Sequence, residues 1–262
     1  MKLEILLSTM HMVNDEIIKK MNIKTDCTII NQCENNFIQK KKYQGNLISI
    51  IDCDERGLSR SRNKALEYAT GDIVLLADDD MIYVDNYEQI VLDAFEKYNE
   101  DILAFQVEGI EKKFKNYRLK TSKVNKLTSM KISSVEIAIR TSSLKSKNIH
   151  FNELFGSGSI YKMGEENIFL FDCVNNGLKI RYIPIKIANL HMNDSTWFSG
   201  FNEKYFFDRG ATYFEMFGRM SDLFVLQFII RKRRVLDISM FRAWKFAKLG
   251  KLDYLERKKN EN

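Results

Sequence analysis

The chain has 262 residues, 45% of them hydrophobic, with a single proline and 12 glycines. This composition excludes a disordered linker or a low-complexity protein and allows one large domain or two small ones. The net charge of +6 belongs to the C-terminal tail, because residues 231–262 hold eleven Lys and Arg against four Asp and Glu, which is +7, and the other 230 residues sum to −1.

Cysteine usage and hydropathy indicate the compartment. The four cysteines show no CxxC spacing, so we expect free thiols in a reducing environment and no zinc site or disulfide framework. The N-terminal run MKLEILLSTMH is too short in apolar residues for a signal peptide. The apolar part of residues 222–234 is far shorter than the roughly 20 residues that cross a bilayer. We therefore expect a cytoplasmic protein.

The first half of the chain alternates short apolar runs with helical patterns. Strands are predicted at residues 3–8, 25–32, 46–52, 72–77 and 101–107, and helices at 14–22, 58–69 and 87–98. Residues 72–77 are apolar throughout, as in a central strand that is covered on both faces. Strands that alternate with helices of about a dozen residues predict a mostly parallel central sheet in an α/β fold.

The second half is less regular. Residues 109–130 are polar and rich in lysine, which predicts a long excursion from the sheet. A strand at 131–139, a helix at 164–177 and a strand at 178–191 are expected to follow. From Phe201 onward the aromatic pattern predicts helices with a basic end.

Polar side chains stand where the predicted strands end. These residues are Ser8, Thr9, Asn31, Gln32, Asp52, Asp78, Asp79, Asp80 and His191. In an open α/β sheet, ligands bind beyond the carboxyl ends of the strands. Three adjacent aspartates repel one another, and a bound Mg²⁺ or Mn²⁺ would offset that repulsion while also contacting a substrate phosphate. The alternative is a solvated acidic turn.

Three arginines, Arg56, Arg60 and Arg62, precede the aspartates. Arg62 falls near the start of the helix predicted at 58–69, where backbone N–H groups also favour anions. A guanidinium pairs with phosphate oxygens in a bidentate fork. An ordinary charged helix face is the alternative. Together with a metal site, Arg56 and Arg62 suggest a nucleotide diphosphate ligand.

The stretch GLSRSRNKALEYATGDIVLLADDD, residues 57–80, resembles family 2 glycosyltransferases of the inverting, A-type fold. Their pattern is roughly G-x-x-x-A-R-N-x-G, then A-x-G-[DE], a hydrophobic run and D-x-D. The spacing from Arg62-Asn63 through Gly71-Asp72 to the aspartates agrees with it. Weaker similarity extends over residues 1 to about 200.

The resemblance implies a Rossmann-like fold that binds a nucleotide sugar. On this basis we expect a catalytic domain in residues 1–200, with a nucleotide-binding half in 1–107 and an acceptor-binding half in 108–200. Residues 201–262 are then a helical, basic C-terminal extension.

The resemblance also implies a metal site that holds Mn²⁺ or Mg²⁺. Asp80 is the expected direct ligand, Asp78 a metal or ribose contact, and His191 a further ligand at its strand end. If Asp79 and Asp80 align with the final pair of the family's Asp-x-Asp-Asp, Ala77 replaces its first aspartate. In the other register, Asp78 and Asp80 form the D-x-D.

The donor contacts that the resemblance implies are Ser8, Thr9, Asn31, Gln32, Asp52, Arg56, Arg62, Asp78, Asp79, Ser195 and Thr196. The family's nucleoside-contacting D-D-x-S is replaced here by Asn31-Gln32-Cys33-Glu34. An amide of that stretch could hydrogen-bond a uracil edge. Ser195 and Thr196, with Trp197, would form a flap over the donor.

A carboxylate pair opens the helix predicted at 164–177. The resemblance makes Glu166 the general base and Glu165 the reserve candidate, because relatives have a Glu-Asp pair here and Glu166 stands in the place of the shorter Asp. The base takes the proton of the acceptor hydroxyl while that oxygen attacks the anomeric carbon. Both glutamates could instead only favour the helix N-terminus, at roughly 0.3–1 kcal/mol each.

The basic tail follows an aromatic, helical stretch. It is read either as a helical core with a solvated basic face, or as an interfacial segment that binds anionic lipid. No nucleic-acid recognition motif accompanies the charge, so we expect no nucleic-acid partner.

These residues and the resemblance predict a metal-dependent inverting glycosyltransferase for hexosyl or N-acetylhexosaminyl transfer. The expected donor is a UDP-sugar, and the expected acceptor is a lipid-linked saccharide of a bacterial capsule or exopolysaccharide. The protein would be cytoplasmic or peripheral on the inner face of the cell membrane, and a homo-oligomer is compatible with it. A nucleotidyltransferase and a non-catalytic nucleotide-sugar-binding subunit are the alternatives.

Overall fold

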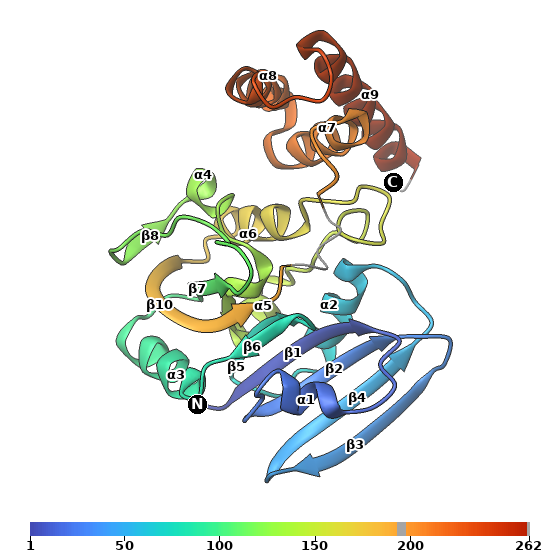
Figure 1. The fold of residues 1–262 in the computed structure, drawn as a ribbon. Coiled ribbons are helices and arrows are strands. Elements are labelled where there is room, and N and C mark those ends of the chain that lie inside the picture. The colour runs from blue at the N-terminus through green and yellow to red at the C-terminus, as the bar shows by residue number, and fades with distance from the viewer. Residues whose placement is uncertain (193–197, 261–262) are drawn as a thin grey trace.

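The computed structural model describes residues 1–192 and 198–260. The predicted α/β fold with a C-terminal group of helices is confirmed (Figure 1). The strands are β1 (Leu3–Met10), β2 (Asp26–Gln32), β3 (Phe37–Tyr43), β4 (Asn46–Cys53), β5 (Ile73–Asp78), β6 (Met81–Tyr83), β7 (Ile102–Gly109), β8 (Ser122–Val124), β9 (Ile137–Arg140) and β10 (Ile180–Leu190).

Helices connect the strands and form the C-terminal end. They are α1 (Glu16–Lys20), α2 (Leu58–Tyr68), α3 (Tyr87–Lys97), α4 (Lys126–Ser129), α5 (Thr141–Lys147), α6 (Glu165–Asn175), α7 (Glu203–Phe217), α8 (Ser221–Lys232) and α9 (Met240–Asn260), with 3-10 turns at Ser134–Glu136 and Gly218–Met220. None of the helices in the described ranges is long and apolar enough to span a bilayer.

The strands join in one mixed sheet in the order β3-β4-β2-β1-β5-β9-β7-β10-β6, with β8 beside β10. The neighbours β4, β2, β1 and β5 are parallel, as predicted, and so are β7 and β10. β9 enters antiparallel between β5 and β7, and the short β3, β6 and β8 also run antiparallel to their partners. The parallel group therefore places four consecutive carboxyl ends at one edge.

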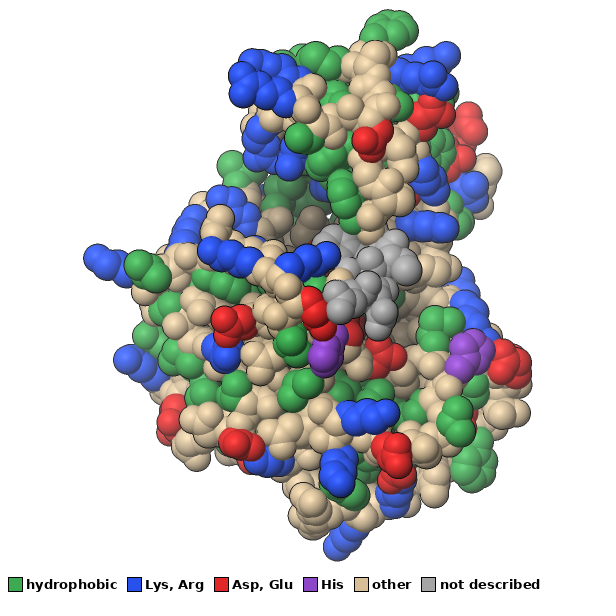
Figure 2. All heavy atoms as spheres, in the orientation of Figure 1, with side chains coloured by type: hydrophobic (Ala, Val, Ile, Leu, Met, Phe, Trp, Pro, Cys, Tyr) green, Lys and Arg blue, Asp and Glu red, His purple; other side chains and the backbone are tan. Residues whose placement is uncertain are grey.

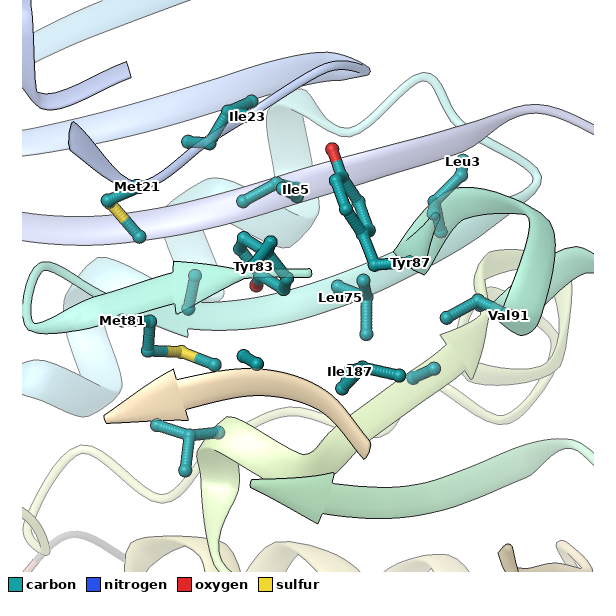
Figure 3. Close-up of a cluster of buried hydrophobic side chains, with 14 of the residues drawn as sticks. Leu3, Ile5, Met21, Ile23, Leu75, Met81, Tyr83, Tyr87, Val91 and Ile187 are labelled. Carbon is teal, nitrogen blue, oxygen red and sulfur yellow. The ribbon is translucent and has the colours of Figure 1, made fainter. Parts of the chain in front are cut away.

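Alternate residues of the central strands face two hydrophobic cores. Ile5 and Leu75 face the core under α1 and α3, together with Tyr83 and Tyr87 (Figure 3). Leu6 and Leu76 face the opposite core, under α2, α5 and α6. Because both faces are covered, β5 is apolar up to Ala77, and the first polar residue marks the end of its burial.

The helices α7, α8 and α9 stand together at one end of the molecule, beyond α6 (Figure 1). α7 and α9 cross closely at Gly210 and Gly250. A Cβ on Gly210 would overlap the carbonyl of Ala247, and one on Gly250 would overlap that of Phe207. Glycine at both positions is therefore what lets the two backbones approach.

Several elements differ from the sequence-based expectation. β3, β6 and α5 were not predicted, and the strand expected at 131–139 is a 3-10 turn followed by the shorter β9. The polar excursion at 109–130 does leave the sheet but contains β8 and α4. β3 has no buried residue and carries three lysines in a row, and α5 has a single apolar residue, so both lack the apolar periodicity on which the prediction depended.

Candidate active site

The parallel register brings the polar strand ends together. Thr9 on β1 lies beside Asn31 on β2, and Asn31 lies beside Asp52 on β4. On the other side of β1, Ser8 pairs with Asp78 on β5. The convergence that the sequence predicted is therefore present.

The three aspartates have different environments. Asp78 accepts from Nη2 of Arg62 at 3.1 Å, and Asp79 accepts from Oγ1 of Thr9 at 2.6 Å. Oδ1 of Asp80 is buried and has no hydrogen-bond partner among the described residues. Desolvation, and then the charges of Asp78 and Asp79, raise the pKa of Asp80 to about 7. Asp80 is thus the carboxylate that most lacks a counter-charge.

His191 lies next to this carboxylate. Its backbone N–H donates to the carbonyl of Asp80 at 2.9 Å, because β6 and β10 pair just before it. Nδ1 of His191 lies 2.8 Å from Oε1 of Glu111, whose Oε2 accepts from the Met192 N–H at 2.7 Å. A carboxylate on one ring nitrogen fixes the imidazole and is typical of metal-ligating histidines. No sequence pattern pointed to Glu111, which lies in the irregular excursion.

The described residues near Asp80 supply some, but not all, of the ligands that a divalent cation needs. No three His, Cys, Asp or Glu side chains in the described ranges are close enough to form a ready-made metal cluster. Asp78, Asp80 and His191 therefore do not form a closed three-ligand cage. Mg²⁺ and Mn²⁺ commonly bind through one or two carboxylates and complete their shell with water and substrate phosphate. The unpaired oxygen of Asp80 suits that mode.

Arg62 lies near the start of α2, as predicted, but its side chain is turned into the protein. Its side chain is 2% exposed, and its terminal nitrogens are bonded to Asp78, to Glu165 at 3.2 Å and to Ser134 at 2.8 Å. A guanidinium so enclosed does not reach a diphosphate in solvent. Arg62 instead joins the aspartate cluster to the first turn of α6, so its predicted role as a direct donor contact is corrected to an internal bridge.

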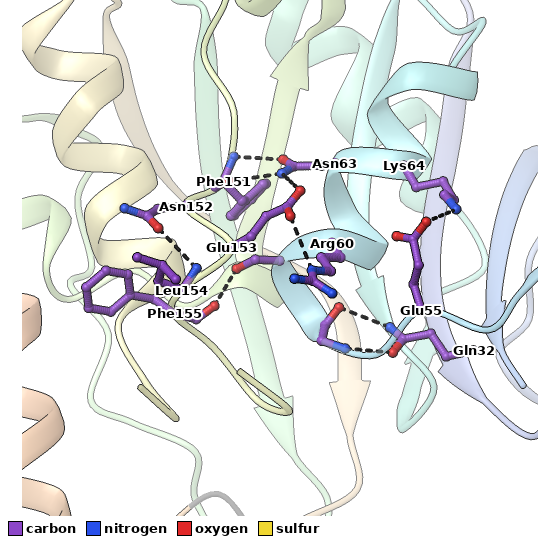
Figure 4. Close-up of polar contacts among 12 residues, drawn as sticks. Gln32, Glu55, Arg60, Asn63, Lys64, Phe151, Asn152, Glu153, Leu154 and Phe155 are labelled. Carbon is purple, nitrogen blue, oxygen red and sulfur yellow. Dashed lines mark hydrogen bonds and ion pairs between the residues drawn. The ribbon is translucent and has the colours of Figure 1, made fainter. Parts of the chain in front are cut away.

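Two other predicted donor contacts are also used internally. The amide of Gln32 accepts from the Gly57 N–H at 2.9 Å and donates to the Gly57 carbonyl at 3.2 Å (Figure 4). The buried Ser8 hydroxyl accepts from Ser61 at 2.8 Å. Both side chains are buried and hold the start of α2 against the sheet, so their predicted contact with a nucleotide stays a prediction.

The remaining predicted donor contacts are closer to solvent. Asp52 is half-buried and accepts from the side-chain amide Nδ2 of Asn31 at 2.7 Å, and Oδ1 of the same amide accepts from the Met12 N–H at 2.8 Å. Arg56 contacts the Cys33 carbonyl at 3.1 Å and the exposed Glu34 carboxylate at 3.0 Å. These contacts leave the side chains of Asp52 and Arg56 near solvent, so their contact with a nucleotide donor stays a prediction. Ser195 and Thr196, with Trp197, lie outside the described residues.

The helix α2 is docked on the loop that precedes the carboxylate pair. Asn63 exchanges two hydrogen bonds with the backbone of Phe151, and Arg60 pairs with Glu153 at 3.2 Å (Figure 4). Further along this loop, a Cβ on Gly156 would lie 3.2 Å from the carboxyl carbon of Glu165. The motif that surrounds Arg62-Asn63 therefore positions the site without lining it.

The carboxylates of Glu165 and Glu166 are distinct. Glu165 is buried and paired with Arg62. Glu166 is half-buried, and its one contact found among the described residues is a 3.4 Å bond from the Asn167 amide. Desolvation, and then the charge of Glu165, raise the pKa of Glu166 to about 8. A carboxylate with a raised pKa is a stronger proton acceptor once ionised.

Comparisons with known proteins agree with this geometry. The sequence model of Glycosyl transferase family 2 matches residues 35–161. Among curated proteins, none matches the chain. The matched region runs from β3 to the loop before α6, so it includes the aspartates and excludes both glutamates.

Solved structures match over most of the chain. Residues 1–349 of TarS from S. aureus in complex with UDP-GlcNAc superpose with a TM-score of 0.64 and 16% identity, covering 90% of this chain and 74% of that one. The same fragment with UDP gives 0.60 and 15% identity, covering 89% and 72%. A longer TarS structure gives 0.63 and 15% identity, covering 90% of this chain and 44% of that one. The predicted A-type glycosyltransferase fold is confirmed.

Proposed function

We propose that the chain is a metal-dependent, inverting glycosyltransferase that moves a sugar from a UDP-sugar to a saccharide acceptor. The observation that carries the proposal is the bridge by which Arg62 joins Asp78, beside the unpaired Asp80, to Glu165, beside the raised-pKa Glu166. A cation-binding carboxylate and a candidate base are thus held by one buried guanidinium. The UDP and UDP-GlcNAc complexes of TarS support the choice of donor.

Different residues of this chain would bind the cation and accept the proton. Asp80 and His191 would hold Mn²⁺ or Mg²⁺, which supplies positive charge for a leaving diphosphate. Thr9 fixes Asp79, and Glu111 fixes the His191 ring. Glu166 would take the proton of the acceptor hydroxyl as its oxygen attacks the anomeric carbon from the face opposite the diphosphate, which inverts that centre.

An activity screen tests the proposal. Purified protein is incubated with a panel of UDP-hexoses and UDP-N-acetylhexosamines, a saccharide acceptor panel and Mn²⁺, and released UDP is measured. We expect UDP release that EDTA abolishes. Glu166→Gln should retain Mn²⁺-dependent UDP binding and lose transfer by a factor of about 10² or more. The matched Glu165→Gln variant tests whether the assignment is off by one residue.

Two experimental results would contradict the glycosyltransferase proposal and favour another function. Pyrophosphate release from a nucleoside triphosphate and a sugar phosphate would identify a nucleotidyltransferase. Binding of UDP-sugars without turnover, with lipid-linked acceptors included, would identify a non-catalytic subunit of an assembly complex.

We further propose that the acceptor is a lipid-linked saccharide of a bacterial capsule or exopolysaccharide, met at the inner face of the cell membrane. The outer face of α8 supports this. Leu223, Leu226 and Ile230 are 62%, 43% and 44% exposed and recur at helical spacing, and with Gln227 and Arg231 they line a hollow of about 310 Å³. Lys and Arg side chains gather over the same helix (Figure 2).

This face combines the two features of an interfacial helix, an apolar stripe and adjacent cations. The basic side chains of Arg231, Lys232, Arg233 and Arg234 follow directly on Ile230. Each cation near an anionic leaflet contributes about 1 kcal/mol.

Flotation with vesicles that contain anionic lipid tests this surface. We expect the intact protein to float and the Leu226→Ser/Ile230→Ser double variant to remain in solution, while Leu249→Ser, exposed on α9, floats like the parent. Equal flotation of the double variant would reject the assignment of α8. Self-association that the same double variant abolishes, without lipid binding, would assign the face to a homo-oligomer.

A further inference from the structure

The polar excursion that leaves the sheet after β7 begins at the candidate cation site. A Cβ on Gly109 would overlap the Lys112 carbonyl, so glycine lets the chain turn sharply there. The turn places Glu111 on the ring of His191, whose backbone is bonded to that of Asp80. The first residues of the excursion are thus bonded to the residues that would hold the cation.

Further along, the excursion is held by contacts of its own. The Tyr117 hydroxyl donates to the Val107 carbonyl and accepts from the Val107 N–H, both at 3.0 Å. Nζ of Lys115 donates to the Lys131 carbonyl at 2.7 Å and to the buried carboxylate of Glu136. β8 then pairs with the first residues of β10. These contacts fix the backbone of the excursion, and most of its cationic side chains take no part in them.

The excursion is strongly basic. Residues 109–130 carry seven Lys and Arg against one Glu, a net charge of +6. Among the residues that the structure describes, Lys115 is the only one of the seven that forms a salt bridge. The other six are exposed, namely Lys112, Lys113, Arg118, Lys120, Lys123 and Lys126. In the longer tail, five of the eleven cations pair with carboxylates. The excursion therefore exposes as many cations without a carboxylate partner as the tail does.

The six exposed cations are spread along β10. Gly109 lies opposite Leu190 and Val124 opposite Ile180, so the excursion runs from the carboxyl end of that strand back to its amino end. Ten residue steps of an extended strand span at most about 33 Å. Lys and Arg side chains gather over β8 and α4 (Figure 2). A row of this extent fits a chain with repeated negative charges, whereas a single phosphate would meet only one part of it.

The last part of the excursion rests on the helix that carries the candidate base. Lys126, the first residue of α4, lies 5.3 Å from the ring centroid of Phe171 on α6. Met130 packs against the cluster that contains Phe171 and Phe155. The excursion therefore contacts both the candidate cation site and the helix that begins with the two glutamates.

We propose that the exposed cations of the excursion bind an anionic saccharide chain, whose units carry phosphate or carboxylate groups, and that this chain is the acceptor. The inference rests on the proposed function for the role of acceptor, but binding can be measured without turnover. Each exposed ion pair contributes little alone, and several along one chain add up. The attachment of the excursion to the candidate site favours a substrate over a lipid surface.

Binding of fluorescein-labelled oligogalacturonate, followed by anisotropy, tests the proposal. We expect the probe to bind more weakly as salt is raised, and neutral maltoheptaose not to compete. Whichever of polyphosphate and unlabelled oligogalacturonate competes at the lower concentration identifies the preferred anionic group. Lys120→Gln/Lys123→Gln should raise Kd about 3–30-fold. Lys245→Gln/Lys259→Gln, which removes the same charge from exposed positions of the tail, should bind like the parent.

Failure of the parent to bind either polyanion, equal loss in the two double variants, or competition by maltoheptaose overturns the inference. Flotation with anionic vesicles that Lys120→Gln/Lys123→Gln abolishes, with oligosaccharide binding kept, would also overturn it and assign the cations to lipid.

An active preparation separates this inference from the proposed function. Lys120→Gln/Lys123→Gln should raise KM for an anionic acceptor and leave KM for the donor unchanged. Polyanion binding without transfer from any donor would contradict the proposed function and keep the binding surface. Transfer to a neutral acceptor, with a KM that the variant does not change, would keep the function and overturn the inference.

Discussion

At the scale of single residues, the aspartate triplet separates into three roles. Asp78 neutralises Arg62, Asp79 is held by Thr9, and Asp80 is left with an unpaired oxygen. A sequence shows three identical carboxylates in a row and cannot assign these partners, because each comes from a different element. The expectation that Asp80 is the one to bind the cation stays a prediction, and the structure gives it a physical reason.

Asp80→Asn should stabilise the metal-free protein at pH 8. The folded-state pKa of Asp80 is raised from 3.8 to about 7, so the wild type loses stability as pH rises from about 4 to 7, and this loss is complete above 7. The melting-temperature gap between variant and wild type in EDTA should therefore shrink from pH 8 to pH 5. Calorimetry at the two pH values measures it, and a gap that grows toward pH 5 would contradict the assignment.

Addition of Mn²⁺ should narrow the melting-temperature gap between the same two proteins at pH 8. A cation at about a hundredfold excess over its Kd stabilises the binding-competent protein by about 2.7 kcal/mol. We expect this gain in the wild type and its absence in Asp80→Asn. An equal rise in both proteins would place the cation elsewhere.

Arg62 is the residue whose role the sequence predicted least well. Its motif position was correct, but a linear pattern does not show that Glu165, more than 100 residues later, closes over it. In a urea titration, Arg62→Met should cost about 3–5 kcal/mol of unfolding free energy because it leaves the buried Glu165 and the half-buried Asp78 unpaired. Arg62→Lys should restore little of it. Arg60→Met, at a half-exposed ion pair, should cost no more than about 1 kcal/mol in the same urea titration.

At the scale of elements, the sequence predicted the helices and strands whose hydrophobic residues follow a regular spacing. The apolar run of β5 and the amphipathic α3 were placed within a residue or two, and the parallel order of the first strands followed from their alternation with helices. The antiparallel β9 and the polar edge strand β3 have no such local signature.

The crossing of α7 and α9 gives an element-scale prediction. Gly210→Ala should destabilise the protein by about 1–3 kcal/mol, although alanine is the better helix former by about 1 kcal/mol, because its Cβ would overlap the Ala247 carbonyl. Lys245→Ala on the exposed face of α9 is the control and should stay within about 0.5 kcal/mol. Chemical denaturation of both variants measures the difference, and a stabilised Gly210→Ala would show that the helices can separate.

At the scale of the whole molecule, the boundary expected at residue 200 does not separate two hydrophobic cores. Phe155, Tyr161 and Ile168 from the sheet side pack in one cluster with Ala211 and Tyr254 from the C-terminal helices. The sequence suggests a domain boundary where its pattern becomes helical and aromatic, at residue 201. Whether a segment folds alone depends, however, on its contacts with distant segments, and the sequence pattern does not show these.

Removal of residues 203–262 should therefore destabilise the remaining sheet. Exposure of two buried aromatic side chains alone corresponds to about 3 kcal/mol or more, which is roughly 6–12 °C in melting temperature for a domain of this size. Circular dichroism and size-exclusion chromatography of the fragment measure it. A fragment that melts like the full chain would restore the two-domain description.

The antiparallel strand β3 lies at the free edge of the sheet, and most of its side chains are exposed. Such an edge offers unpaired backbone groups to any extended chain it meets. Lys40 and Lys42 are exposed along it, while Lys41 pairs with Asp15, so an incoming strand would have to remove water from two exposed cations. The lysines that made β3 hard to predict from the sequence therefore also oppose aggregation by strand pairing at this edge.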